Sequence, residues 1–129
     1  MQVAALMRRD AAILDRNDTI QYAAQAMADS NNDTVLVTGD GALVGLLTAR
    51  DVLIRVIVKG LDPTVTPLFQ VMSTEPAVCR EADDAAATVN GMAARGIHHL
   101  PVLDAAGRPV GLIAIADAAL LSRLLADRP

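Results

Sequence analysis

The strongest constraint on the fold of this 129-residue chain is an internal repeat. The stretch GLLTARD at residues 45–51 returns as GLIAIAD at 111–117, so the two copies lie 66 residues apart (111 minus 45). The same shift places further residues on identical ones: Asp18 on Asp84, Gly41 on Gly107, Val44 on Val110 and Leu46 on Leu112. Self-similarity at a fixed spacing indicates a repeated structural unit. Neither unit is long enough to bury its faces alone, so we expect the two to share a core.

Apolar periodicity predicts the same order of elements in both units, strand, helix, strand, strand, helix. In the first unit the predicted elements are strand 11–14, helix 18–30, strand 34–38, strand 43–48 and helix 49–60. Asp18 is expected to cap the first helix, and Gly60 to end the second. In the second unit they are extended piece 77–79, helix 84–95, strand 99–103, strand 109–114 and helix 115–126.

The domain boundaries follow from this repeat. The segment 60–72 carries two prolines and joins the two halves. We therefore expect a first repeat at 1–60, a linker at 61–71 and a second repeat at 72–129. The alternation of helices and strands in each repeat places the chain in the α/β (α+β) class.

Charge and composition argue against several classes of protein. The net charge of −4 disfavours a nucleic-acid binder, which needs a basic patch to neutralise phosphates. No apolar stretch reaches the roughly 20 residues that span a bilayer, and we expect no signal peptide at the start of the chain. Cys79 is the single cysteine, so no internal disulfide forms and we expect a reducing, cytoplasmic compartment. No P-loop, Ser-His-Asp pattern or evident carboxylate pair is present, so we expect no enzyme.

Several longer stretches resemble a known family, and together they cover nearly the whole chain. They are LVGLLTARDVL, VKGLDPTVTPLFQVM, MSTEPAV and GIHHLPVLDAAGRPVGLI. These stretches, in this order, resemble the CBS domain, which is named after cystathionine beta-synthase. A tandem pair of CBS domains is often called a Bateman module. The resemblance implies two small β-α-β-β-α units packed through their sheets about a pseudo-two-fold axis. It also implies that pairs of such modules associate as disc-shaped dimers.

Thr48 and Asp51 are the main candidate ligand residues. Thr48 ends a predicted strand, and Asp51 falls in the first turn of the helix that follows. Unpaired N–H groups at a helix start favour anions, a hydroxyl can donate to a phosphate, and a carboxylate can accept two bonds from vicinal hydroxyls. The resemblance assigns Thr48 to the phosphate and Asp51 to the ribose of AMP, ADP, ATP or another adenosyl ligand such as S-adenosylmethionine. The alternative is that both residues only cap the helix.

The second copy of the motif is altered. Asp117 keeps the expected ribose contact, but Ala114 replaces the threonine and Ala116 replaces the arginine. Loss of a hydroxyl that donates to a charged oxygen costs on the order of 1.5–3 kcal/mol. We expect this second cleft to bind weakly, to accept an adenosyl group without phosphates, or to stay empty.

Further residues besides Thr48, Asp51 and Asp117 are candidates for the ligand site. His98, the first histidine of HHLPV, falls where the family can touch a nucleotide phosphate; the alternative is a partly exposed histidine at a strand edge. Asn32 takes the place of His98 in the first half. Ile13 and Val78 lie where the family lines its adenine pocket. Arg50 stands beside the phosphate position; the alternative is a solvated arginine.

No metal site is expected. His98 and His99 are neighbours on a strand and therefore point to opposite faces. Only two histidines and one cysteine are present, whereas zinc usually takes three or four ligands.

Two functions are compatible with these features. One is a regulatory module that senses an adenosyl ligand, needs no cofactor and acts on a separate target protein. The other is an interaction module with vestigial clefts. In either case we expect a homodimer that buries at least about 1,000 Å² through the helices 49–60 and 115–126. These carry an excess of apolar residues, among them Val52, Leu53, Val56, Ile57, Leu120, Leu121, Leu124 and Leu125.

Overall fold

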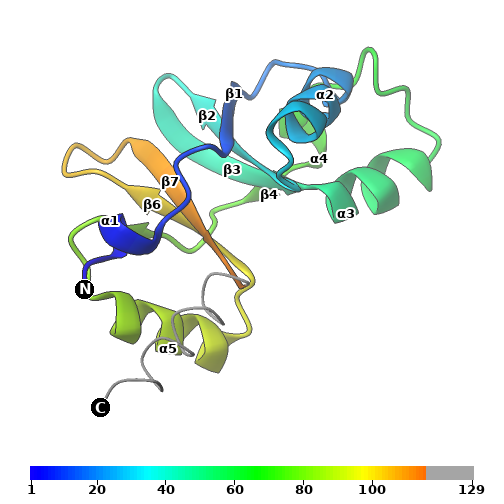
Figure 1. The fold of residues 1–129 in the computed structure, drawn as a ribbon. Coiled ribbons are helices and arrows are strands. Elements are labelled where there is room, and N and C mark those ends of the chain that lie inside the picture. The colour runs from blue at the N-terminus through cyan, green and yellow to red at the C-terminus, as the bar shows by residue number, and fades with distance from the viewer. Residues whose placement is uncertain (116–129) are drawn as a thin grey trace. The chain divides into compact units, whose positions relative to one another are not determined.

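The computed structural model of the chain describes residues 1–115, which form two compact units (Figure 1). The N-unit is Asp10–Pro76, and the C-unit combines Met1–Arg9 with the chain from Ala77 onward. The first nine residues therefore belong with the second half of the chain. No helix within the described residues is long and apolar enough to cross a membrane.

The N-unit is built on a four-stranded sheet in the order β1-β2-β3-β4. Its strands are β1 (Ala12–Asp15), β2 (Thr34–Gly39), β3 (Ala42–Thr48) and β4 (Ser73–Thr74). β1 runs parallel to β2, and the other neighbouring strands pair antiparallel. The helical elements are α2 (Ile20–Ser30), α3 (Ala49–Val52), the π-helical turn η1 (Leu53–Ile57) and α4 (Leu68–Val71).

The core of the N-unit is aliphatic. Helix α2 contributes Ile20, Ala23 and Met27, which share one helical face, as the apolar spacing predicted. The other buried members are Val35, Val37, Leu47, Val56, Leu68 and Val71. The segment predicted as a linker, 61–71, thus includes a helix whose apolar side packs into this core.

The C-unit repeats the plan with a three-stranded sheet in the order β5-β6-β7. Its elements are α1 (Val3–Leu6), β5 (Cys79–Arg80), α5 (Ala85–Arg95), β6 (His99–Leu103) and β7 (Pro109–Ala114). Again a parallel pair, β5 with β6, is followed by an antiparallel hairpin. The predicted α/β class is confirmed. The predicted helix 115–126 lies, apart from its first residue, outside the described residues.

The caps of the two long helices correct one prediction. Thr19, not Asp18, caps α2, since its hydroxyl accepts the N–H of Tyr22 at 3.2 Å. Asp18 closes the preceding turn instead, because its carboxylate accepts the N–H of Asp15 at 3.0 Å. Both residue types are good caps, so residue preference alone does not decide between them.

The same contacts correct the repeat spacing. In the C-unit, Asp83 accepts the N–H of Arg80 and Asp84 caps α5. Asp18 therefore corresponds to Asp83, so the shift is 65 residues here (83 minus 18), not 66. It becomes 66 only after the hairpin turn. There the pair Thr38 and Leu43 corresponds to Leu103 and Pro109, with one residue more between them.

The predicted helix 49–60 changes its winding after one turn. Residues 49–52 are α-helical, and 53–57 form a π-helical turn in which the N–H of Val58 bonds to the carbonyl of Leu53 at 3.0 Å. The helical backbone ends before Gly60, which has a positive φ of 72°. A π turn adds a residue to a helical turn and is common at functional sites.

Candidate functional site

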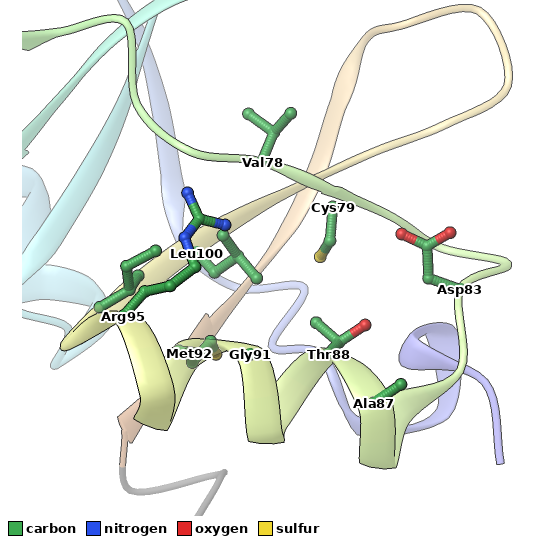
Figure 2. Close-up of a pocket in the computed structure, with 10 residues that line it drawn as sticks. Val78, Cys79, Asp83, Ala87, Thr88, Gly91, Met92, Arg95 and Leu100 are labelled. Atoms are coloured by element: carbon green, nitrogen blue, oxygen red, sulfur yellow. The ribbon is translucent and has the colours of Figure 1, made fainter.

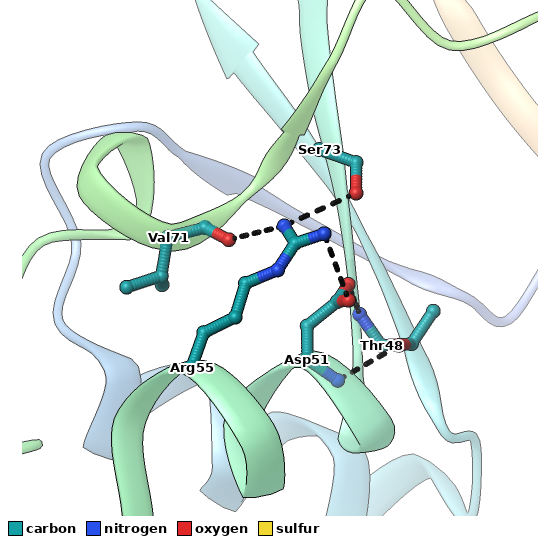
Figure 3. Close-up of polar contacts among 5 residues, drawn as sticks. All are labelled: Thr48, Asp51, Arg55, Val71 and Ser73. Atoms are coloured by element: carbon teal, nitrogen blue, oxygen red, sulfur yellow. Dashed lines mark hydrogen bonds and ion pairs between the residues drawn. The ribbon is translucent and has the colours of Figure 1, made fainter. Parts of the chain in front are cut away.

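The motif at residues 45–51 forms the junction between β3 and α3, and its polar side chains cap the helix (Figure 3). The hydroxyl of Thr48 accepts the N–H of Asp51 at 3.1 Å. In return, Oδ2 of Asp51 accepts the N–H of Thr48 at 2.9 Å. This reciprocal pair is a capping box, so the capping role considered from the sequence is present.

Capping does not exhaust the hydrogen-bonding capacity of either side chain. A hydroxyl has one O–H donor and two acceptor lone pairs, and in Thr48 the cap uses only an acceptor. An ionised carboxylate has about four acceptor sites, and the cap uses one of those on Asp51. The Asp51 side chain is 16% exposed. Helix capping and ligand binding are therefore compatible roles for the same two side chains.

Arg55 is a further member of this cluster that the sequence reasoning missed. Its Nη2 lies 3.7 Å from Oδ1 of Asp51. Its Nη1 donates to the carbonyl of Val71 at 2.8 Å and to Oγ of Ser73 at 3.3 Å (Figure 3). The Asp–Arg spacing of four residues on a predicted helix is the signal that could have identified the pair.

The remaining candidates of the N-unit are exposed. Arg50 lies in the first turn of α3 with its side chain in solvent. Ile13 lies on β1, and 45% of it is exposed, which is high for a strand isoleucine. Both side chains are therefore accessible to a ligand, and neither is part of the core.

His98 has a different counterpart from the one predicted. Its carbonyl accepts the N–H of Ile115 at 2.9 Å, and in the N-unit the carbonyl of Asp33 accepts the N–H of Ala49 at 2.8 Å. The residue that matches His98 is therefore Asp33, and the assignment to Asn32 is wrong because the shift is 65 here. Asn32 instead donates to the carbonyl of Asp10 at 3.3 Å. An acidic side chain thus stands where the second copy has an imidazole.

Val78 borders a cavity of about 220 Å³ between the segment 78–83 and α5 (Figure 2). Val78 is 43% exposed, close to the value of Ile13, its counterpart at a shift of 65. The cavity is lined by Val78, Cys79, Asp83, Ala87, Thr88, Gly91, Met92, Arg95, Ile97 and Leu100. Burial, with a smaller contribution from the carboxylate of Asp83, raises the pKa of Cys79 to about 11. The thiol is therefore protonated at neutral pH and is not an activated nucleophile.

Two positions of the second motif fall beyond or at the end of the described residues. Asp117 lies outside the described residues. Ala114, which replaces the threonine of the first copy, is buried on β7 opposite His99. Within residues 1–115, no three His, Cys, Asp or Glu side chains gather closely enough to hold a metal ion.

The glycine that opens each copy of the motif has a packing role that sequence reasoning did not identify. A methyl group at Gly45 would lie 2.5 Å from Sδ of Met72 and 2.8 Å from the carbonyl oxygen of Ser73. At Gly111 it would lie 2.8 Å from both Sδ of Met7 and the carbonyl oxygen of Arg8. In each unit the glycine lets the residues that follow the short helix, α4 or α1, pair closely with the strand.

The family model of the CBS domain matches the chain twice, at residues 3–57 and 68–122. The two matches are 65 residues apart at both ends, the same shift that relates the first parts of the two units. This chain belongs to the CBS-domain family. The first CBS domain begins with α1, which belongs to the C-unit by its contacts. The second begins with α4, which belongs to the N-unit.

Relatives of this CBS-domain chain differ widely in length. It is 34% identical over 114 residues to the CBS domain-containing protein YhcV of Bacillus subtilis, covering 88% of this chain and 80% of the relative. It is 31% identical over 97 residues, 75% of this chain, to the meiotically up-regulated gene 70 protein of Schizosaccharomyces pombe, of which it spans only 13%.

Among solved structures, a CBS domain protein from Pyrobaculum aerophilum complexed with AMP has the same fold. The TM-score is 0.80 at 22% identity, and the match covers 98% of this chain and 99% of the other.

Proposed function

We propose that this CBS pair is a non-catalytic regulatory module that binds an adenosine nucleotide, AMP, ADP or ATP, through Thr48 and Asp51. The observation that carries the proposal is the capping box, which holds a hydroxyl and a carboxylate side by side with spare hydrogen-bonding capacity. The AMP complex of the similarly folded Pyrobaculum protein supports the choice of ligand class.

The two side chains have complementary tasks in this proposal. Thr48 donates its O–H to a phosphate oxygen while it still accepts the N–H of Asp51. Asp51 accepts hydrogen bonds from the ribose hydroxyls on the lone pairs that the cap leaves over. The exposed guanidinium of Arg50 adds positive charge near the phosphate, and Ile13 supplies an apolar surface for the base.

The second copy of the motif is proposed as the weaker of the two. Asp117, His98 and Val78 are retained as its ligand residues, but Ala114 cannot donate to a phosphate. A nucleoside-type adenosyl ligand such as S-adenosylmethionine, which carries no phosphate, suits this composition better than a nucleotide.

Thr48→Ala tests the proposed function. Isothermal titration calorimetry should show that AMP affinity falls by a factor on the order of ten or more, because a hydrogen bond to a charged oxygen is lost. Adenosine has no phosphate, so its affinity should change by less than about twofold. Thr48→Ser, which keeps the hydroxyl and the cap, should retain the wild-type ratio of AMP to adenosine affinity. Equal losses for both ligands would mean that Thr48 is only a helix cap.

A second proposed role, homodimerisation, rests on the exposed apolar face of η1. Leu53 and Ile57 are each 58% exposed and lie one helical turn apart, and Ile54 and Val58 are exposed beside them. Such a continuous apolar surface is unfavourable in water, so we propose that a second copy of the chain covers it. Failure of the wild-type protein to bind any adenosyl compound would favour this interaction role alone.

Ile57→Asp tests the dimer. Light scattering should report a dimer for the wild-type protein at micromolar concentration and a monomer for the variant, because a carboxylate would be buried unpaired at the interface. Val65→Asp is the matched control, since Val65 is 72% exposed but lies outside the helix. A wild-type monomer, or equal dissociation by both variants, would contradict the proposed interface.

A further inference from the structure

We propose that Arg55 is a positioning residue for the Asp51 carboxylate, and that it makes recognition of the ribose depend on the segment Val71–Ser73. The inference rests on the proposed role of Asp51 and adds a residue that the family resemblance did not assign. Arg55 is not expected to touch the ligand itself.

The guanidinium of Arg55 has contacts on two sides (Figure 3). On one side, Nη2 faces Oδ1 of Asp51 at 3.7 Å. On the other, Nη1 donates to the carbonyl of Val71 and the hydroxyl of Ser73 at 2.8 and 3.3 Å. A guanidinium is planar and its N–H groups form a rigid fork, so the contacts on one side fix the direction of the other.

The two oxygens of Asp51 are thereby held by different partners. The N–H of Thr48 bonds to Oδ2, and Arg55 faces Oδ1. A carboxylate held at both oxygens cannot rotate freely about its terminal torsion, which is otherwise broad. Recognition of two vicinal hydroxyls needs both acceptor positions in a defined orientation, so this restraint favours ribose over a sugar that lacks one hydroxyl.

The contacts form a closed ring through the N-unit. Ser73 pairs with Leu46 on β3, and β3 runs into Thr48, Asp51 and then Arg55, which returns to Ser73. A displacement of the segment Val71–Ser73 would therefore move the guanidinium and with it the carboxylate. This ring links the candidate ribose site to the segment that leads out of the N-unit at Pro76.

The second copy of the motif has no arginine at the position that corresponds to Arg55. At the shift of 66 residues that relates the two motifs, Leu121 stands in the place of Arg55, while Asp117 stands in the place of Asp51. An aliphatic residue cannot form the corresponding ion pair. The proposal therefore concerns the Asp51 site alone.

The main test compares AMP with 2′-deoxy-AMP by calorimetry in Arg55→Met and Arg55→Lys. Arg55→Met should lower AMP affinity about threefold or more and change 2′-deoxy-AMP affinity by less than about twofold, so the preference for AMP falls. Arg55→Lys should restore part of that preference, because the charge beside Asp51 returns without the fork. Equal losses for the two ligands would reduce Arg55 to a structural role and overturn the proposal.

Arg16→Met is the matched control. Arg16 pairs with Asp40 at the same distance of 3.7 Å, and its side chain has the same exposure of 44%, but its partner Asp40 lies at the hairpin turn. This variant should leave the ratio of AMP to 2′-deoxy-AMP affinity unchanged. A change as large as that in Arg55→Met would show that loss of any arginine in the unit has this effect.

A ligand-free measurement separates this proposal from the proposed function. The shifts in urea midpoint caused by Arg55→Met and Asp51→Ala should be non-additive in the double variant, because the two side chains contact each other. Additive shifts would overturn the positioning role even if AMP binds. If the shifts are non-additive but the wild-type protein binds no AMP, the proposed function is overturned and the contact between Arg55 and Asp51 stands.

Discussion

Gly45→Ala is expected to lower the free energy of unfolding by about 1–3 kcal/mol, the usual effect of forcing extra atoms into a packed site. The added methyl group would meet Sδ of Met72 at 2.5 Å and the carbonyl oxygen of Ser73 at 2.8 Å. The Met72 side chain can rotate away, but the carbonyl belongs to β4, which pairs with β3. Relief therefore requires the two strands to move apart.

Gly91→Ala provides a control of opposite sign for the glycine at position 45. Gly91 lies inside α5, and no atom would come within 4 Å of an added methyl group. Alanine is favoured over glycine in a helix, so this variant should gain about 0.5–1 kcal/mol. Urea unfolding of both variants measures the difference. A loss at both positions, or at neither, would contradict the packing role of Gly45.

Asp51→Ala is expected to weaken AMP binding about tenfold or more, because a charged acceptor of the ribose hydroxyls is lost. Asp51→Asn, which keeps the volume and an acceptor for the N–H of Thr48, separates this effect from loss of the cap. Both variants should bind AMP more weakly by calorimetry, while Asn should retain more of the folding stability than Ala.

Asp117→Ala is the comparison within the same chain. Its effect on AMP affinity should be smaller than that of Asp51→Ala, since Ala114 has no hydroxyl to bind the phosphate. Equal losses from the two variants would show that the proposed order of the two motifs is wrong.

The ligand residues stay a prediction that these titrations test. The homodimer, the cytoplasmic location and the separate target protein also stay predictions.

Local patterns in the sequence were sufficient for most of the secondary structure and for the family. The apolar spacing of Ile20, Ala23 and Met27 predicted the buried face of α2, and the paired motifs predicted two related α/β units. These features succeed because helix and strand periods are set by backbone geometry over a few residues. The capping box of Thr48 and Asp51 was also foreseeable, since its partners are only three residues apart.

A single repeat shift does not hold along the whole chain, because changes in the length of a surface loop are tolerated freely. One additional residue in the second hairpin changes the shift from 65 to 66, and a single shift therefore misplaced the counterparts of Asp18 and His98. The identical glycines and aspartates after the turn favour a shift of 66 when the two halves of the sequence are aligned. The hydrogen bonds of Asp83 and Asp33 show which residues are equivalent.

The sequence by itself determined the elements, their order and the identity of the repeated motif, because each depends on contacts within a few residues. Tertiary structure alone decided that Met1–Arg9 joins the C-unit and that α4 joins the N-unit. It also explains the glycine that begins each motif, and it brings Arg55 to Asp51. These features depend on burial and pairing between segments far apart in the chain, such as Val3 against the C-unit core or Ser73 beside β3, and no local pattern records such distant partners.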